Sequence, residues 1–323
     1  MNVSESRAGS LDATCPMNEI VWTQEYQVEK IAFATTAIIL NILSFPVTIL
    51  MNVLVIMAVK KRPRLQSKYN ILLACLAGTD LLVGAASQPS YIVGQIYVIR
   101  GISLSEYCGY HNLANLLVFS PIFASVLHLT LISIERFVAM KYTFSYMTIV
   151  TGLRLKIAVV SSWVFAFCPA ILGSLSKEQE IGFISNVASV MVLFLGISLI
   201  VFCHLSVYFV TRRHEKQIKC EQVSAEAAAN FAKEKKALKT TRIIIMALLL
   251  CLIPLFLYVF CWFAFSGGNS HTGNVVLLSH PVFVWLYSLN SLFNPIIYCY
   301  RNNMFRKTCM ELLRMKCTNF NED

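Results

Sequence analysis

Apolar residues dominate the chain in long, nearly uncharged runs that are separated by short polar segments. About 20 apolar residues in an α-helix cross the roughly 30 Å hydrocarbon layer of a membrane, and each run reaches that length. Outer-membrane barrels do not contain unbroken runs of this kind, because their strands alternate between apolar and polar residues. The pattern predicts an all-α membrane protein, a seven-transmembrane helix bundle over residues 31–59, 69–98, 107–140, 155–175, 183–211, 240–265 and 275–300.

The composition agrees with a membrane protein, because 57% of the residues are hydrophobic and only 14% are charged. Soluble domains carry about 25% charged residues. Basic residues gather after the first, third, fifth and seventh runs, whereas the opposite side has few of them. By the positive-inside rule, the N-terminus is extracellular and the C-terminus is cytoplasmic. We therefore expect a multi-pass protein of the plasma membrane, whose net charge of +10 faces membrane lipids rather than nucleic acid.

Three regions follow from this topology: an extracellular tail over residues 1–30, the helical domain over 31–300, and a cytoplasmic end over 301–323. In the last region, apolar and basic residues interleave in a way that is typical of a short amphipathic helix at the membrane interface. Cys309 and Cys317 in this helix are candidate palmitoylation sites.

The extracellular side carries two further candidate modification sites. Asn2 begins an N-glycosylation sequon, Asn2-Val3-Ser4. Cys15 and Cys108 both lie outside the membrane, so their compartment allows a disulfide between them.

A few polar residues interrupt the apolar runs at similar depths. Asp80 is the only charged residue near mid-membrane, where an isolated carboxylate is expensive. One interpretation is a hydrogen-bonded cluster that fixes helix packing, and the other is an oxygen-lined site for a hard cation such as Na⁺. The residues of this candidate cluster are Asp80, Ser125, Asn290, Ser291 and Asn294.

A charge pair, Glu135-Arg136, ends the third apolar run. Near the end of a membrane helix a charged side chain can reach the interface, so the cost of the charge is much lower than at mid-membrane. Arg136 can therefore hold or release a neighbouring helix at the cytoplasmic surface. Pro254 and Pro295 each remove a backbone hydrogen bond, which lets the cytoplasmic halves of the sixth and seventh helices swing.

Six signatures occur in order along the helices: Asn52, Asp80, Glu135-Arg136-Phe137, Trp163, Cys251-Leu252-Ile253-Pro254 and Asn294-Pro295-Ile296-Ile297-Tyr298. In this order they resemble the rhodopsin-like (class A) G-protein-coupled receptors over about residues 30–316. Phe305, seven residues after Tyr298, is similar to the start of that family's eighth helix.

The resemblance implies a receptor that transmits the signal of an extracellular ligand to heterotrimeric G proteins. It implies that Arg136 is held at rest by Glu135 and by an acid at the foot of helix six, and that it turns toward two tyrosines on activation. It also implies that the cluster around Asp80 is a sodium pocket, so an allosteric Na⁺ is the one cofactor expected. The residues implied in the switch are Glu135, Arg136, Phe137, Tyr208, Glu234, Pro254, Asn294, Pro295 and Tyr298.

The sequence also departs from the usual pattern of that family. Phe137 replaces the usual tyrosine, Leu252 replaces a common tryptophan, and the fifth run has no proline. The loop expected over residues 173–186 is short and has no cysteine. These departures are similar to the melanocortin branch, near the adenosine and lipid receptors.

The resemblance excludes ligand classes more readily than it names one. Val118 stands where amine receptors carry an aspartate, and Ser288 stands at the position of the retinal lysine of opsins. We therefore expect a peptide, nucleoside or lipid rather than a monoamine or retinal. The helical register predicts a pocket wall of Gln88, Tyr91, Val118, Phe119, Leu255, Phe256, Val259, His280, Val284 and Tyr287.

Other functions fit parts of the pattern. Phe137 and Leu252 leave open a receptor that binds ligand but couples weakly or not at all to G proteins. A channel or transporter should show paired broken helices or pore-lining charges, and an enzyme needs a nucleophile–base or metal constellation. We expect no enzymatic activity. Arrestin binding through tail phosphorylation is expected to be sparse, because Thr308 and Thr318 are the only serine or threonine residues after the seventh run.

Overall fold

The computed structural model describes residues 26–102, 104–175, 179–220, 231, 235–236, 238–251, 253–254 and 278–319. Within these ranges the chain is helical apart from short connections, which confirms the predicted all-α class. Five helices in these ranges are long and apolar enough to cross a membrane, and a bent helix pair adds a sixth. The remaining predicted span, 240–265, lies only partly within the described residues, where 238–251 are helical.

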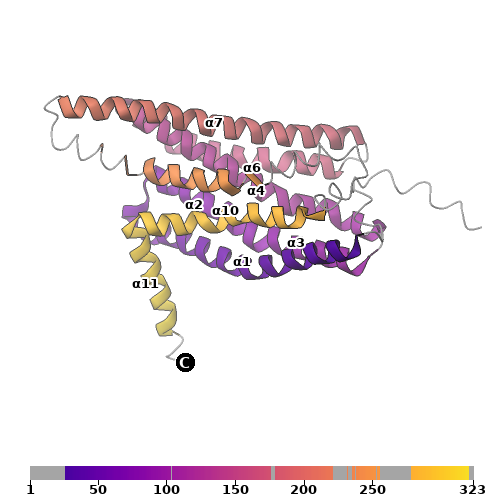
Figure 1. The fold of residues 1–323 in the computed structure, drawn as a ribbon. Helices are drawn as coiled ribbons and strands as arrows, with labels where there is room; N and C mark the ends of the chain where they lie inside the picture. The colour runs from indigo at the N-terminus through magenta and orange to yellow at the C-terminus, as the bar shows by residue number, and fades with distance from the viewer. Residues whose placement is uncertain are drawn as a thin grey trace, which may run out of the picture.

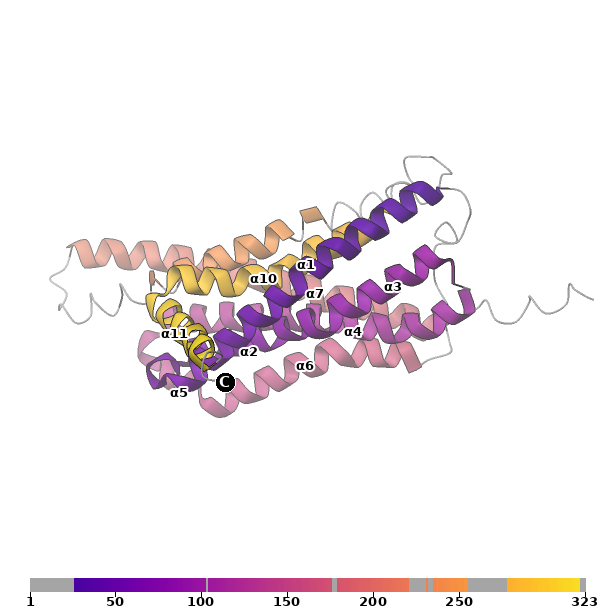
Figure 2. The same ribbon diagram turned by 90° about the horizontal axis from the view of Figure 1, so that it is seen from below.

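The long helices lie lengthwise along one another in a bundle (Figures 1 and 2). A central helix, α4, packs against α2, α3, α6 and α7, while α1 packs against α2, α3 and α10. Because α4 touches so many neighbours, a group at its end is able to influence several helices at once. The bounds are α1 (Gln27–Lys61), α2 (Lys68–Leu82), α3 (Gln88–Arg100), α4 (Leu104–Lys141), α6 (Gly152–Leu175), α7 (Gln179–Cys220) and α10 (His280–Arg301).

Short elements connect these helices at the end of the bundle where α11 (Asn303–Asn319) lies, here called the α11 end. They are η2 (Pro63–Leu65), η4 (Thr143–Ser145) and α5 (Tyr146–Ile149). Asn302 is extended between α10 and α11, and its Oδ1 accepts a hydrogen bond from the Met304 N–H at 3.0 Å. This break turns α11 away from the axis of α10 (Figure 1).

The helix α11 buries one set of its residues and exposes another. Its buried residues are Phe305, Thr308, Cys309 and Leu312, whereas Met304, Met310 and Leu313 are exposed. An ion pair between Arg62 and Glu311 joins α11 to the end of α1.

The second predicted span contains a wider helical turn that hydropathy did not predict. The π-helix η3 (Val83–Ser87) joins α2 to α3 just before Pro89. Proline has no N–H for the carbonyl four residues earlier, and a π-turn accommodates this loss. In the same turn, a Cβ atom on Gly84 would lie 3.0 Å from Cγ1 of Ile49 and 3.2 Å from Cγ2 of Thr48, so α1 packs directly against this glycine.

Gly84→Ala is therefore expected to destabilise the bundle by about 1–2 kcal/mol, because α1 must shift to admit the methyl group. The measurement is the melting temperature of the purified protein, followed by tryptophan fluorescence. Gly78→Ala is the matched control, since a Cβ there would meet nothing within 4 Å and alanine favours the helix. Equal melting temperatures for the two variants would contradict this packing.

Two predicted boundaries are wrong. The loop expected over 173–186 is much shorter, because α6 continues to Leu175 and α7 already begins at Gln179. Likewise α7 does not end near residue 211 but continues to Cys220, and it projects beyond its neighbours (Figure 1). Residues 212–220 are rich in arginine, lysine, glutamate and glutamine, which favour a helix without being apolar.

Candidate functional site

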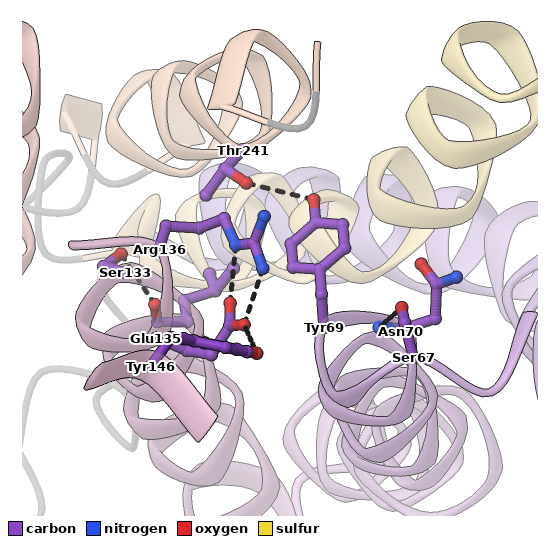
Figure 3. Close-up of polar contacts among 9 residues, drawn as sticks. Ser67, Tyr69, Asn70, Ser133, Glu135, Arg136, Tyr146 and Thr241 are labelled. Carbon is purple, nitrogen blue, oxygen red and sulfur yellow. Dashed lines mark hydrogen bonds and ion pairs between the residues drawn. The ribbon is translucent and has the colours of Figure 1, made fainter. Parts of the chain in front are cut away.

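The charge pair at the α11 end of α4 is almost completely buried. Glu135 is 3% exposed and Arg136 is 5% exposed. The guanidinium donates two hydrogen bonds to the carboxylate, from Nε to Oε2 and from Nη2 to Oε1, each at 2.5 Å (Figure 3). Bidentate arginine–carboxylate pairs are strong and geometrically specific, but a buried pair also needs further partners for its charged atoms.

The carboxylate finds its further partner on α5. The hydroxyl of Tyr146 donates a hydrogen bond to Oε1 of Glu135 at 2.6 Å. The ammonium of Lys68, at the start of α2, lies 5.0 Å from the centre of the Tyr146 ring and donates to the carbonyl of Val150. The connection after α4 is thus tied both to the charge pair and to α2.

The guanidinium finds its further partner on α2. Cζ of Arg136 lies 4.3 Å from the centre of the Tyr69 ring, within the range of a cation–π interaction. The Tyr69 hydroxyl lies 3.0 Å from Oγ1 of Thr241, in the helix over 238–251. Figure 3 shows these groups together, with Arg136 between Glu135 and Tyr69 and with Thr241 above the Tyr69 hydroxyl.

The sequence did not mark Lys68, Tyr69, Tyr146 or Thr241 as functional residues. Lys68 contributed only as one of the basic residues from which the membrane orientation was predicted. Tyrosine and threonine are common near the ends of membrane helices, so their types carry little signal. Their place at the same end of the predicted membrane spans as the charge pair was the one signal in the sequence.

The two tyrosines of the predicted switch, Tyr208 and Tyr298, each contact another aromatic ring. Tyr208 is 40% exposed and contacts Phe209 and Arg212 on its own helix. Tyr298 is buried, and its ring centre is 6.4 Å from that of Phe305.

Phe137 contacts the rings of Tyr142 and Phe202, each at 6.3 Å between centres. Pro295 lies inside α10, and Pro254 is helical. Glu234, the predicted acid at the foot of helix six, lies outside the described residues.

The predicted cluster around Asp80 is present. Asp80 is 0% exposed, and its Oδ1 accepts hydrogen bonds from Ser125 at 3.1 Å and from Ser291 at 2.8 Å. Its Oδ2 accepts a hydrogen bond from Nδ2 of Asn294 at 2.8 Å. Asn52 extends the cluster to α1, because its Nδ2 donates to the backbone carbonyl of Ser291 at 3.0 Å. Three neutral donors thus stabilise one buried carboxylate.

The donor atoms of this cluster suit a hard cation. Asn290 is buried but makes no hydrogen bond to Asp80, and its Oδ1 has no partner among the described residues. Within the described part of the chain, the Oδ1 atoms of Asn52 and Asn294 and the hydroxyl of Tyr298 are also buried without a hydrogen-bond partner. Hydroxyl, amide and carboxylate oxygens are the ligands of hard cations. Within the described ranges no group of three histidine, cysteine or acidic residues could hold a softer metal.

The predicted ligand pocket is only partly described. Tyr91 and His280 meet across α3 and α10, with 3.4 Å between the Tyr91 hydroxyl and Nδ1 of His280. Gln88 instead turns to α1, where its Nε2 donates to Oδ1 of Asn41 and Oγ of Ser44 at 3.2 and 2.8 Å. Val118, Val284 and Tyr287 are buried. Leu255, Phe256, Val259 and the side chain of Phe119 lie outside the described part of the chain.

Among the predicted modification sites, only Cys309 has a described side chain. It is 5% exposed, and its Sγ lies 3.8 Å from that of Cys299. The Cys299 thiol and burial raise the pKa of the Cys309 thiol, so the thiolate that acylation needs is disfavoured. The side chains of Asn2, Cys15, Cys108 and Cys317 lie outside the description.

Comparison with known proteins gives one consistent answer. The profile of the family described as 7 transmembrane receptor (rhodopsin family) matches residues 51–298. The adenosine receptor A3 of Ovis aries is 26% identical over 87% of this chain and 90% of its own length. The histamine H2 receptor of Rattus norvegicus is 26% identical over 85% of this chain and 78% of its own. The high-affinity lysophosphatidic acid receptor of Xenopus laevis is 24% identical over 85% of this chain and 81% of its own length.

Proposed function

Because this chain belongs to the rhodopsin family of seven-transmembrane receptors, we propose that its buried Glu135–Arg136 pair is the switch for G-protein coupling. As a member of this family, the protein is a G-protein-coupled receptor of the plasma membrane, not an enzyme. Its partners are an extracellular ligand and a heterotrimeric G protein. The family match leaves no support for a transporter or channel.

The observation that carries the proposal is the burial of Arg136 against both Glu135 and Tyr69. A guanidinium held in this way is not available to a partner at the α11 end of the bundle. Binding of a G protein there would require Arg136 to leave Glu135, and the helix over 238–251 to move away. The bundle would then have two states, and the ligand and the G protein would each favour the active one.

The α11 end is the cytoplasmic side in this proposal, and the tail over residues 1–30 is extracellular. Support comes from the exposed basic residues at this end: Lys60 and Lys61 in the last turn of α1, Arg62 and Arg64 just after it, and Arg306, Lys307 and Arg314 on α11. The same residues would attract anionic membrane lipids to residues 301–323. Arrestin recruitment through the tail would be weak, since Thr308 is buried.

The cluster around Asp80 is proposed as an allosteric sodium site. A single carboxylate with two hydroxyls and nearby unpartnered amide oxygens supports this choice. Ser291 and Asn294 lie on α10 together with Tyr298, so a change at the cluster would act on the same helix as the tyrosine of the switch.

The ligand is proposed to enter at the other end of the bundle, near Tyr91 and His280. The relatives are named for adenosine, histamine and lysophosphatidic acid, which differ widely in chemistry. Val118 is buried and gives no carboxylate for an ammonium group, which favours a peptide, nucleoside or lipid over a monoamine.

Glu135→Gln is expected to raise ligand-independent nucleotide exchange about tenfold, because a neutral amide holds Arg136 more weakly by about 1.4 kcal/mol. The measurement is GTP analogue uptake by a panel of purified heterotrimers, with the receptor in lipid nanodiscs. Glu311→Gln is the matched control, since it removes the exposed ion pair with Arg62 and should leave exchange unchanged. If no heterotrimer responds to wild type or to Glu135→Gln, the receptor couples weakly or not at all.

A further inference from the structure

Tyr69 joins two parts of the proposed resting state. The face of its ring lies 4.3 Å from Cζ of Arg136, and its hydroxyl lies 3.0 Å from Oγ1 of Thr241 (Figure 3). Thr241 is completely buried and belongs to the helix over 238–251, while Tyr69 belongs to the first turn of α2. One side chain thus contacts both the arginine of the switch and the helix that must move.

The geometry makes these two contacts depend on each other. A tyrosine has only two side-chain torsions, and a hydrogen bond at its hydroxyl fixes the first of them and therefore the position of its ring. The ring face attracts the guanidinium only while the cation lies over it. When the helix over 238–251 moves outward, the bond to Thr241 breaks, the tyrosine is free to swing about its first side-chain torsion, and Arg136 loses one of its holding contacts.

We propose that Tyr69 is a positioning residue that couples the release of Arg136 to the movement of the helix over 238–251. This inference rests on the proposed role of Arg136 in G-protein coupling. It differs from a direct ion pair between the arginine and an acid on that helix, because a neutral tyrosine on α2 transmits the constraint. In the water-poor interior, a hydroxyl–hydroxyl bond and a stacked cation both act more strongly than they would in water.

The test compares variants that remove one atom group each. Tyr69→Phe keeps the ring and loses the hydroxyl. Thr241→Val keeps the shape of the side chain and loses the hydroxyl that bonds to Tyr69. Each is expected to raise ligand-independent nucleotide exchange about threefold, the effect of losing one hydrogen bond from the resting state. The double variant should equal either single variant, because both remove the same bond. Thr240→Val is the matched control, since its hydroxyl donates to the backbone carbonyl of Lys236, four residues earlier in the chain.

A second comparison separates positioning from a structural role. In an Arg136→Gln background, Tyr69→Phe should no longer change exchange, because the tyrosine acts through the arginine. If Tyr69→Phe and Thr241→Val match wild type while Glu135→Gln raises exchange, this inference is wrong and the proposed function stands. If Glu135→Gln also has no effect on any heterotrimer, both this inference and the proposed function are wrong.

Discussion

Arg136→Gln is expected to weaken the nucleotide-free complex between the receptor and its G protein at least about thirtyfold. Hydrogen bonds that involve a charged group contribute about 1.5–3 kcal/mol, and the released guanidinium would make such bonds with the Gα helix in the active state. The measurement is the dissociation constant of the complex after removal of nucleotide, with both partners purified. Arg64→Gln is the matched control, because it makes the same chemical change at an exposed position in η2.

The loss of Arg136 also leaves Glu135 buried without its cation, which is destabilising in itself. The melting temperature of each variant must therefore be measured alongside the affinity. A folded Arg136→Gln receptor that binds the G protein as tightly as wild type would contradict a role of this arginine in coupling.

Asp80→Asn is expected to abolish the effect of sodium on the receptor. In wild type, raising Na⁺ from about 0.01 M to about 0.15 M at constant ionic strength should lower ligand-independent exchange about threefold, because the ion binds the resting state more tightly. The asparagine keeps the size of the side chain but removes the carboxylate charge that would pair with the cation. N-methylglucamine replaces Na⁺ in the control buffer.

Ser125→Ala is a graded companion to Asp80→Asn. It removes one of the two hydroxyl oxygens beside Asp80 and leaves the carboxylate in place. It should reduce the sodium effect without abolishing it. A sodium response that persists in Asp80→Asn would show that the cluster acts only in helix packing.

The cluster around Asp80 and the charge pair of α4 could be predicted from the sequence, because polar groups are rare in apolar runs and their depth follows from the helical rise. Four of the five predicted cluster residues do bond to one another around Asp80. The exception, Asn290, is buried at the same level but does not bond to the carboxylate. Depth along a helix thus predicts proximity, while the direction of a side chain depends on helix rotation, which the sequence does not specify.

The contacts that hold Arg136 could not be predicted in the same way. Tyr69 and Tyr146 meet the charge pair only because α2 and α5 approach the end of α4, and no local pattern encodes that approach. The boundaries of α7 were missed for a different reason. Hydropathy measures which residues prefer the membrane, whereas a helix continues wherever its residues favour helical geometry.

The most direct test of the switch compares Glu135→Gln with the double variant Glu135→Gln/Arg136→Gln in the nucleotide exchange assay. The double variant leaves no buried charge unpaired, so any loss of activity does not come from an orphaned carboxylate. If the released arginine is what engages the G protein, the double variant should lose the gain of Glu135→Gln and return to wild-type exchange or below. If the double variant stays as active as Glu135→Gln alone, Arg136 is not the group that couples this receptor to its G protein.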